Sequence, residues 1–472
     1  MSIKDLTKKL TQAHWLFAII ALIGGVFYVY LTPPLWGFDE VSHFNRSYQI
    51  AKGDFIPPTD DDGAVLKDMP SSLVELEYYV YADLMDNEKV GSSFRRDVAN
   101  TEAYTTLTSR SFSDNLQQSP GVATYSPVAY IAPSIGVFVS QLFGSSIGTA
   151  IDLARLSSLF FYIVLVGFSI KILHDKKIKW LIFVVALMPM SLFQGAMVSA
   201  DGMVIAISVL FISLFLRLVL NSEAEKSKKL IYVLAGAVIL LPLVKINYLF
   251  LSLGILLIPS TVFNSKKMAV LIKVGSLVLM ASLATIWSFI TKVTSSNPDS
   301  PRPDGLPVVA SEQIAYVLHN PINFLVAVVR SVVDASDIYI KSMTSYIGWN
   351  ETPLPIIFIL LILSGVVLAA LYARQEYVGI RKKVYILSAL AFVGILSIFG
   401  VLYVAFNPTG YSTVDGVQGR YFIPFIPFVA MLLVLHMPLT LTIKDRLAPY
   451  IFGAISITCL VASLIYYYLS TY

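Results

Sequence analysis

Long apolar runs separated by short polar connections dominate this chain. A run of about 18 or more apolar residues is typical of a helix that spans a membrane. The pattern predicts eleven spans, near residues 13–32, 150–172, 179–197, 203–220, 229–243, 246–261, 268–291, 354–373, 383–405, 421–440 and 447–469. The stretch 229–261 is interrupted at 241–247, which we interpret as a tight turn between two spans.

The composition agrees with a membrane location. Hydrophobic residues make up 56% of the 472 positions and charged residues 14%, whereas soluble proteins carry about 25% charged residues. This balance excludes a cytosolic enzyme, a disordered chain and a nucleic-acid binder. Cys459 is the single cysteine, so no intramolecular disulfide can form. The predicted fold class is therefore an all-α integral membrane protein.

The distribution of charge predicts the orientation. With eleven spans and a cytoplasmic N-terminus, the loops on the N-terminal side hold 20 of the 34 basic residues and six of the 30 acidic ones. Lys and Arg favour cytoplasmic loops, so we expect the C-terminus outside. Counting residues 124–143 as a twelfth span would invert every later loop. We therefore interpret them as a helix that lies in the outer membrane interface.

The expected organisation has five parts, and two of them are outside loops. The first loop carries 15 acidic residues within 33–121, with short helices predicted near 38–51 and 71–88. The run 60–63 (DDDG) lacks further calcium-ligand spacing and is better explained as a solvated turn. The second loop is expected to contain an amphipathic or re-entrant helix at 311–334. The parts are 1–32 (N-terminus and first span), 33–149 (first outside loop with interfacial helices), 150–291 (spans 2–7), 292–353 (second outside loop) and 354–472 (spans 8–11).

Ionisable residues crowd the outside ends of the predicted spans. Such groups are costly in or beside a membrane unless they are paired or functional. Asp39, Glu40 and His43 follow the first span, and a helix beginning there would place Asp39 and His43 on one face. These residues could form an acidic helix start that complements the helix dipole. Alternatively, a carboxylate acts as a general base, or as a metal ligand with His43, although hard cations usually need more oxygen ligands.

A second group of residues suits a phosphate. Arg420 follows Gln418 in the run 418–424 (QGRYFIP), and its planar fork fits phosphate oxygens. It could equally be an interfacial Arg in the aromatic belt. Lys245 and Arg155 have the same two interpretations, and Asp201 could pair with one of them. Further outside residues in this group are Tyr125 and Arg330.

Five short motifs occur in the order found in a known family. They are 33–44 (PPLWGFDEVSHF), 125–130 (YSPVAY), 200–202 (ADG), 348–355 (GWNETPLP) and 416–424 (GVQGRYFIP). The chain resembles a family of bacterial polytopic membrane proteins of unknown function, which is remotely similar to the GT-C glycosyltransferases. That resemblance implies a GT-C-like bundle with a long first outside loop, interfacial helices and a site facing outward.

The resemblance also implies an activity. GT-C enzymes transfer a sugar from a polyprenyl-phosphate carrier to an acceptor, which here would be a glycan of the bacterial cell envelope. In that reading Asp39 is the base, with Glu40 as a competing base or as a residue that orients His43. Arg420, with Lys245 or Arg155, stabilises the leaving phosphate. Substrate contacts come from Gln418, Asp201, Tyr125 and Arg330.

Two other functions compete with a transferase in the plasma membrane. A transporter or flippase of a lipid-linked glycan would share the basic residues, but it would favour polar groups at mid-membrane and internal symmetry, and neither is visible. A non-catalytic scaffold of envelope assembly would make the acidic cluster dispensable. The sequence assigns no metal ligands and no cofactor, and a divalent metal is compatible with it but not required. It leaves open the sugar, the acceptor and the choice between Asp39 and Glu40.

Overall fold

Among the described residues, seven helices are apolar and long enough to cross a membrane on their own. The structure is a computed structural model that describes residues 11–59, 65–85, 101–119, 121–220, 228–292, 306–348 and 354–472. A helix satisfies its own backbone hydrogen bonds, which a membrane interior requires. The seven helices are α2 (Ala13–Leu31), α8 (Ile147–Ile172), α11 (Ala200–Leu220), α14 (Lys266–Lys292), α18 (Ile356–Val378), α19 (Arg381–Phe406) and α21 (Ala448–Thr471).

The remaining predicted spans are helical but shorter or broken. Residues 179–197 form two helices that meet at an angle of 66°, because Pro189 cannot continue the preceding helix. Residues 246–261 form a series of short helical turns rather than one helix. These elements are α9 (Lys179–Ala186), α10 (Pro189–Ala196), α12 (Lys228–Val244), η3 (Ile246–Tyr248), α13 (Leu249–Ser252), η4 (Leu253–Leu257), η5 (Ser260–Val262), η7 (Gly419–Phe425) and α20 (Ile426–Leu435).

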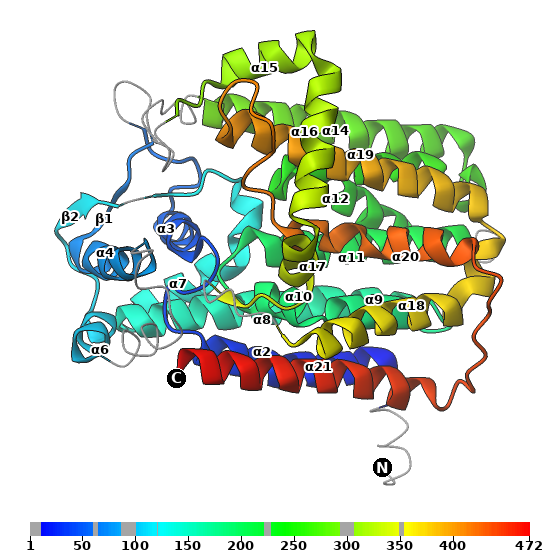
Figure 1. The fold of residues 1–472 in the computed structure, drawn as a ribbon, viewed down its shortest axis with the longest axis horizontal. Helices are drawn as coiled ribbons and strands as arrows, with labels where there is room; N and C mark the ends of the chain where they lie inside the picture. The colour runs from blue at the N-terminus through cyan, green and yellow to red at the C-terminus, as the bar shows by residue number, and fades with distance from the viewer. Residues whose placement is uncertain are drawn as a thin grey trace.

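The helical membrane fold predicted from the sequence is confirmed, with a different count of uninterrupted spans. Among the described residues, up to nine spans result if each bent helix pair is counted once. The turn predicted within 241–247 is present, since α12 ends at Val244 and Lys245 has an extended backbone. Helix α2 begins at one end of the bundle and α21 finishes at the opposite end (Figure 1).

Short elements cover the end of the bundle where α2 finishes, which we call the loop end. The first loop supplies α3 (Glu40–Ala51), α4 (Ser71–Met85) and α6 (Glu102–Ser109), with β1 (Asp68–Pro70) and β2 (Leu116–Gln118) paired antiparallel. The predicted helices at 38–51 and 71–88 correspond to α3 and α4. Their apolar residues share a core with α7 and α8, in which Phe44, Leu73 and Ile151 are fully buried. The loop is therefore a packed cap.

Residues 124–143 contain a 3-10 turn, η2 (Pro127–Ala129), and a helix of 12 residues, α7 (Ile131–Leu142). Twelve residues rise about 18 Å, too short to cross a membrane of roughly 30 Å. The predicted helix at 311–334 is a pair, α15 (Ala310–His319) and α16 (Pro321–Asp334), bent by 106°. Helix α17 (Ser336–Thr344) follows. Residues 60–63 and 349–353, which belong to stretches named in the sequence analysis, lie outside the described residues.

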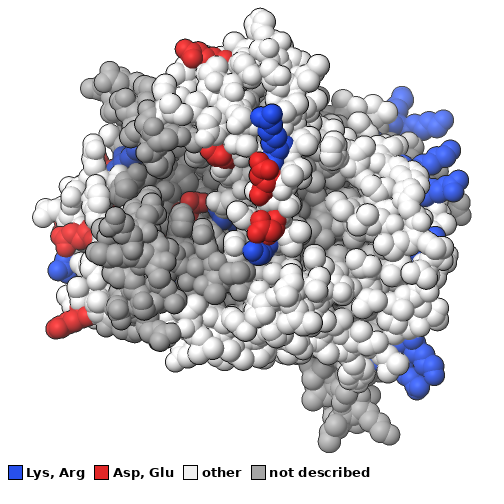
Figure 2. All heavy atoms as spheres, viewed as in Figure 1, with Lys and Arg blue, Asp and Glu red and all other residues white. Residues whose placement is uncertain are grey.

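Charged side chains are unevenly placed on the face shown in Figure 2. Lys and Arg gather at the end of the bundle opposite α3 and α4, which we call the basic end. The start of α2, the α8–α9 connection, the last turns of α18 and the start of α21 meet there around one cleft. The acidic side chains visible in that view lie over the loop end and the α15–α17 region. The two ends therefore differ in charge as the sequence predicts.

Candidate active site at the loop end

Four charged side chains from distant parts of the chain form one cluster at the loop end. The guanidinium of Arg420 donates from Nε to Asp201 at 2.9 Å and from Nη2 to Asp39 at 3.0 Å. The ammonium of Lys245 donates to the other carboxylate oxygen of Asp201. Asp201 thus holds both cations, and Arg420 joins the two carboxylates. We call Asp39, Asp201, Lys245 and Arg420 the charged cluster.

The members of the charged cluster differ sharply in exposure. The side chain of Asp39 is 48% exposed, whereas those of Arg420, Asp201 and Lys245 are 3%, 6% and 13% exposed. Buried charges persist in proteins when they are paired and hydrogen-bonded, as these three are. Asp39 is therefore the group that an incoming molecule can reach, with the three buried charges behind it.

The backbone at Asp39 is unusual. Asp39 immediately precedes α3 and has φ 54° and ψ 19°, in the left-handed region. Non-glycine residues adopt this region infrequently, and such conformations cluster at functional sites. The Asp39 side chain makes no capping hydrogen bond to α3. The carboxylate is thus turned away from the helix start and toward Arg420, which removes the helix-capping explanation of this residue.

Aromatic rings line the cations of the cluster. The guanidinium carbon of Arg420 lies 4.2 Å from the ring centre of Phe38. The Lys245 ammonium lies 4.5 Å from the ring centre of Tyr421 and 5.5 Å from that of Tyr125. Rings at these distances attract a cation through their electron-rich faces. Tyr125 is 39% exposed, so it also forms part of the wall around Asp39 and Lys245.

His43 lies behind Asp39 on α3 and is buried. Its Nδ1 is 2.7 Å from the hydroxyl of Tyr130, and its ring stacks near Tyr125 at 6.1 Å. Burial lowers the pKa of His43 to about 4, against an opposing effect of Asp39. The imidazole is consequently neutral near pH 7. His43 ties residues 125–130 to α3, and Ser126 ties the same residues to α12 through the carbonyl of Leu243.

Glu40 and Arg155 form a separate buried pair beneath the cluster. Arg155 donates to both carboxylate oxygens of Glu40, at 2.8 and 2.5 Å, and both side chains are 0% exposed. Its other donations go to the carbonyls of residues 29, 32 and 33. A guanidinium has five N–H groups, and these five contacts use all of them. Arg155 has no N–H left for a lipid phosphate, contrary to the sequence interpretation.

Glu40 also accepts two backbone hydrogen bonds, from Gly37 at 2.9 Å and Val198 at 3.2 Å. The pair therefore joins the end of α2, the turn that leads to Asp39, helix α8 and the segment just before Asp201. A carboxylate with this many donors is a poor candidate for a base that must meet a substrate. Its place in the structure is to fix the two aspartates of the charged cluster relative to each other.

Two motif glycines permit close backbone approach at the cluster. A Cβ at position 419 would lie 1.9 Å from the carbonyl oxygen of Tyr339, so η7 packs directly on α17. The amide of Gly419 donates to Ser342 at 2.8 Å. A Cβ at position 202 would lie 2.4 Å from the carbonyl oxygen of Gln194. These contacts explain why glycine flanks both Arg420 and Asp201.

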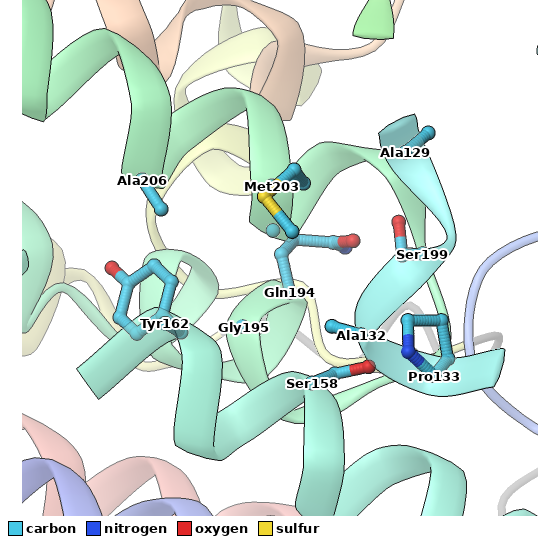
Figure 3. A pocket seen from close by; sticks show the side chains of 11 residues that line it. Ala129, Ala132, Pro133, Ser158, Tyr162, Gln194, Gly195, Ser199, Met203 and Ala206 are labelled. Atoms are coloured by element: carbon cyan, nitrogen blue, oxygen red, sulfur yellow. The ribbon is translucent and has the colours of Figure 1, made fainter. Parts of the chain in front are cut away.

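A small cavity lies under the cluster, between α8, α10 and α11. Figure 3 shows Gln194, Ser199, Tyr162 and Met203 around it. Its volume of about 10 Å³ is close to the minimum for one water molecule. The Oε1 atom of Gln194 is buried and has no hydrogen-bond partner among the described residues. The cavity therefore suits a water that serves Gln194, and it is too small for a sugar.

An open apolar groove is lined by residues on either side of Lys245 in the sequence. It has a volume of about 420 Å³ and runs between the α12–α13 turns and α14. Pro242 and Ile246 line it beside Lys245, and Met280, Ala284 and Phe289 line it from α14. Its lining is apolar apart from Thr285 and Ser288. The groove therefore offers a surface suited to a hydrocarbon chain, formed in part by sequence neighbours of Lys245.

The structure gathers several of the sequence-predicted residues and separates others. Asp39, Asp201, Lys245, Arg420 and Tyr125 lie together. Glu40 and Arg155 lie beneath them, and His43 lies behind. Gln418 precedes η7, and its buried Oε1 has no partner among the described residues.

Arg330 lies on the exposed face of α16, and no contact within the described part of the chain joins it to the cluster. Phe38, Tyr130 and Ser126 were not singled out as functional by the sequence, although each stands within one of the quoted motifs. Across the described ranges, no group of three or more His, Cys, Asp or Glu side chains could hold a metal ion.

A sequence profile described as "Predicted membrane protein (DUF2142)" matches residues 22–429. The chain belongs to this family. The match confirms the resemblance to a membrane-protein family of unknown function. It runs from within α2 to the first turn of α20 and includes every residue of the charged cluster. No curated protein sequence matches the chain.

Among solved structures, the chain is similar to the crystal structure of ArnT from Cupriavidus metallidurans bound to undecaprenyl phosphate. The sequence identity is 12% and the TM-score is 0.41, over 97% of this chain and 76% of that chain. A likeness at this level carries no argument about activity.

Proposed function

We propose that this chain is an inverting membrane glycosyltransferase. It transfers a sugar from a polyprenyl-phosphate-linked donor to a glycan acceptor of the cell envelope, on the non-cytoplasmic face. The observation that carries this proposal is the exposed Asp39 carboxylate, which pairs with buried Arg420 in a cluster that also holds Lys245. An apolar groove is lined by sequence neighbours of Lys245. The carboxylate would receive the proton of the acceptor hydroxyl, the cations would bind the phosphate, and the groove would hold the lipid tail.

Asp39 is the proposed base. Its Oδ2 accepts from Arg420, while Oδ1 accepts no hydrogen bond from the described residues and is free to meet a hydroxyl. It takes the proton of the acceptor hydroxyl as that oxygen bonds to the anomeric carbon. The bond from the anomeric carbon to the phosphate oxygen breaks, and its electron pair leaves with the polyprenyl phosphate. A single displacement inverts the anomeric centre.

Arg420 and Lys245 are the proposed phosphate-binding residues. Negative charge grows on the leaving phosphate, and fixed cations stabilise it most when they need not reorganise. Asp201 supplies that fixation because it holds both cations from behind. The Lys245 ammonium has three donors, and one of them goes to Asp201. Tyr125, beside the Lys245 ammonium, and Gln418, two residues before Arg420, are proposed to contact the donor. Arg330 on α16 has no role in this scheme, because no contact among the described residues joins it to the charged cluster.

The groove beside Lys245 is the proposed seat of the lipid tail. A phosphate bound at Lys245 would place an attached hydrocarbon chain over Ile246 and the face of α14. The tail comes from the hydrocarbon of the bilayer, so its fit in the groove depends on van der Waals packing rather than on removal from water. Glu40, Arg155 and His43 act in this scheme as positioning residues, since their contacts fix the backbone on both sides of Asp39.

The first test compares envelope glycans in a deletion strain complemented with the wild type or with Asp39→Asn. Asn keeps the size and the left-handed backbone of Asp39 but cannot take a proton. We expect Asp39→Asn to leave the strain without the sugar substituent that the deletion loses. Asp337→Asn is the matched control, because Asp337 is an exposed acid paired with Lys341 on α17. Full complementation by Asp39→Asn would overturn the base assignment and favour a flippase or a scaffold.

The second test measures binding of undecaprenyl phosphate to the purified full chain. Lys245→Gln should weaken binding by about 10- to 100-fold, because a charge-assisted hydrogen bond to phosphate contributes roughly 1.5–3 kcal/mol. Lys341→Gln, which removes an exposed charge on α17, should leave binding unchanged. Equal binding by the two variants would remove Lys245 from the phosphate site.

A further inference from the structure

A large cleft opens at the basic end of the bundle, at the opposite end from the charged cluster. Its volume is about 1040 Å³. The start of α2, the α8–α9 connection, the last turns of α18 and the start of α21 form its walls. All four of these regions are ends of candidate membrane spans. The cleft therefore lies at the level where the spans leave the apolar layer.

The lining of the cleft carries an excess of positive charge. Five Lys and Arg residues and three Asp and Glu residues contribute to it. Aromatic side chains provide an apolar floor, since Trp180 and Tyr372 are buried and Trp180 stacks on Phe452. A basic rim above an apolar floor suits a ligand with an anionic head and a hydrocarbon portion.

The three acids of the cleft are already engaged by protein donors. Glu376 accepts the amides of Lys177 at 2.6 Å and Ile178 at 3.0 Å, which would otherwise be unsatisfied at the start of α9. Asp445 accepts the hydroxyl of Tyr372 at 2.6 Å. Asp175 accepts from Arg217 outside the cleft. These contacts anchor the walls and leave little acidic character for a ligand.

The basic residues of the cleft differ in whether the protein already engages them. Lys177 lies over the ring of Tyr372 and 3.8 Å from Asp445, and Lys179 donates to the carbonyl of His174. Lys171, on α8, and Arg446, just before α21, make no hydrogen bond or ion pair with the described residues, and both side chains are exposed. They are the donors available to an incoming anion.

We propose that this cleft binds the phosphate headgroup of an anionic phospholipid, with Lys171 and Arg446 as its principal ligands. Basic pockets between membrane helices recognise such headgroups because each cation near an anionic bilayer surface contributes favourably. The position at the ends of the spans puts the headgroup at the membrane surface and its acyl chains beside α2 and α21. The site is separate from the proposed transfer reaction and does not depend on it.

The test is native mass spectrometry of the purified full chain, titrated with phosphatidylglycerol and, separately, with phosphatidylcholine. Lys171→Gln/Arg446→Gln should weaken phosphatidylglycerol binding roughly tenfold or more, since each basic residue near a membrane surface contributes about fivefold. Lys267→Gln/Lys382→Gln is the matched control, because both are exposed lysines near the basic ends of α14 and α19 and neither lines the cleft. Lys171→Arg/Arg446→Lys should retain binding.

Three results would overturn the proposal. Equal weakening by the two Gln double variants would show general attraction to the basic surface. Equal binding of phosphatidylglycerol and phosphatidylcholine by the wild type would show that the cleft does not select an anionic headgroup. Complete displacement of phosphatidylglycerol by excess inorganic phosphate, with no effect of acyl chain length, would assign the cleft to a soluble phosphate compound. The substituted side chains are exposed, so each single Gln variant gives the same comparison if a double variant folds poorly.

Discussion

Arg155 and Glu40 form an ion pair in which both side chains are fully buried. Every N–H group of the Arg155 guanidinium donates to a protein oxygen. The pair is separated from Asp39 by one peptide bond and from Asp201 by the short segment that begins at Val198. The relative position of the two aspartates thus depends on an ion pair that neither of them touches. Reactive groups need such support to stay within a fraction of an ångström of the productive geometry.

Glu40→Gln should strongly destabilise the protein. Removing one charge leaves the buried Arg155 guanidinium without its counter-ion, which typically costs about 3–5 kcal/mol. The free energy of unfolding in detergent measures the effect. Glu75→Gln is the matched control, because Glu75 also pairs with an arginine, Arg110, but both side chains are about half exposed; it should change stability by less than about 1 kcal/mol. Similar losses in the two variants would contradict the role given to the buried pair.

Asp39 should tolerate Asn and resist Val. Asn adopts the left-handed region with little penalty, whereas a β-branched residue at φ 54° is strained by roughly 1–2 kcal/mol. Thermal unfolding of the purified variants should therefore place Asp39→Asn near the wild type and Asp39→Val below it. If Val is as stable as Asn, the backbone at this position has relaxed out of the left-handed region.

Gly419→Ala should disturb the cluster without changing any of its charges. The new methyl group would overlap the carbonyl of Tyr339 on α17, so η7 has to move and carry Arg420 with it. We expect undecaprenyl phosphate binding to fall and stability to drop by about 1–3 kcal/mol. Gly236→Ala on α12 is the control, because nothing lies within 4 Å of its added Cβ. Unchanged binding in Gly419→Ala would mean that η7 can shift without displacing Arg420.

Glu77 makes the first loop more stable in acid. It is fully buried on α4, accepts from Ser119 at 2.8 Å, and burial raises its pKa to about 7. Because the folded state binds this proton more tightly, the stabilisation is complete below about pH 4.5 and is lost as the pH rises to about 7. Glu77→Gln should therefore gain up to about 3 kcal/mol over the wild type at pH 8 and nothing at pH 4. A pH-independent difference would refute this assignment.

His43 should make the protein less stable in acid, the opposite of the effect of Glu77. Its pKa of about 4 in the folded protein lies below the ordinary value of 6.5, so the unfolded chain takes up this proton first. The contribution of His43 to stability is present above about pH 6.5 and is lost as the pH falls through about 4. The denaturation midpoint of His43→Gln should thus fall less than that of the wild type between pH 7 and pH 4. An unchanged slope would show that folding does not shift the pKa of His43.

Much of the helical architecture follows from the sequence because apolar periodicity and length are local properties. The breaks were harder to place. Pro189 marks the 66° bend between α9 and α10, but the pattern around it is as apolar as an unbroken span. Residues 246–261 have the composition of a helix and form short turns instead, since packing against α19 and α12 decides their course.

The residues of the site were visible in the sequence, and their pairing was not. Charges beside apolar runs drew attention to Asp39, Asp201, Lys245 and Arg420. Which carboxylate meets which cation depends on contacts across hundreds of residues, and Glu40 and Asp39 look alike as neighbours in the sequence. Their directions diverge because Asp39 adopts a left-handed backbone, which aims one carboxylate at Arg420 and the other at Arg155.

The separation of these partners along the chain has a consequence for biosynthesis. Glu40 and Arg155 are 115 residues apart, and Asp39 and Arg420 are 381 apart. At a translation rate of about 5–20 residues per second, Arg155 emerges roughly 6–23 s after Glu40 and Arg420 roughly 19–76 s after Asp39. The buried Glu40–Arg155 pair can form while the ribosome is still producing the later helices. The charged cluster can be completed only near the end of synthesis. A nascent chain halted between these points would contain the Glu40–Arg155 pair, but Asp39 would lack Arg420.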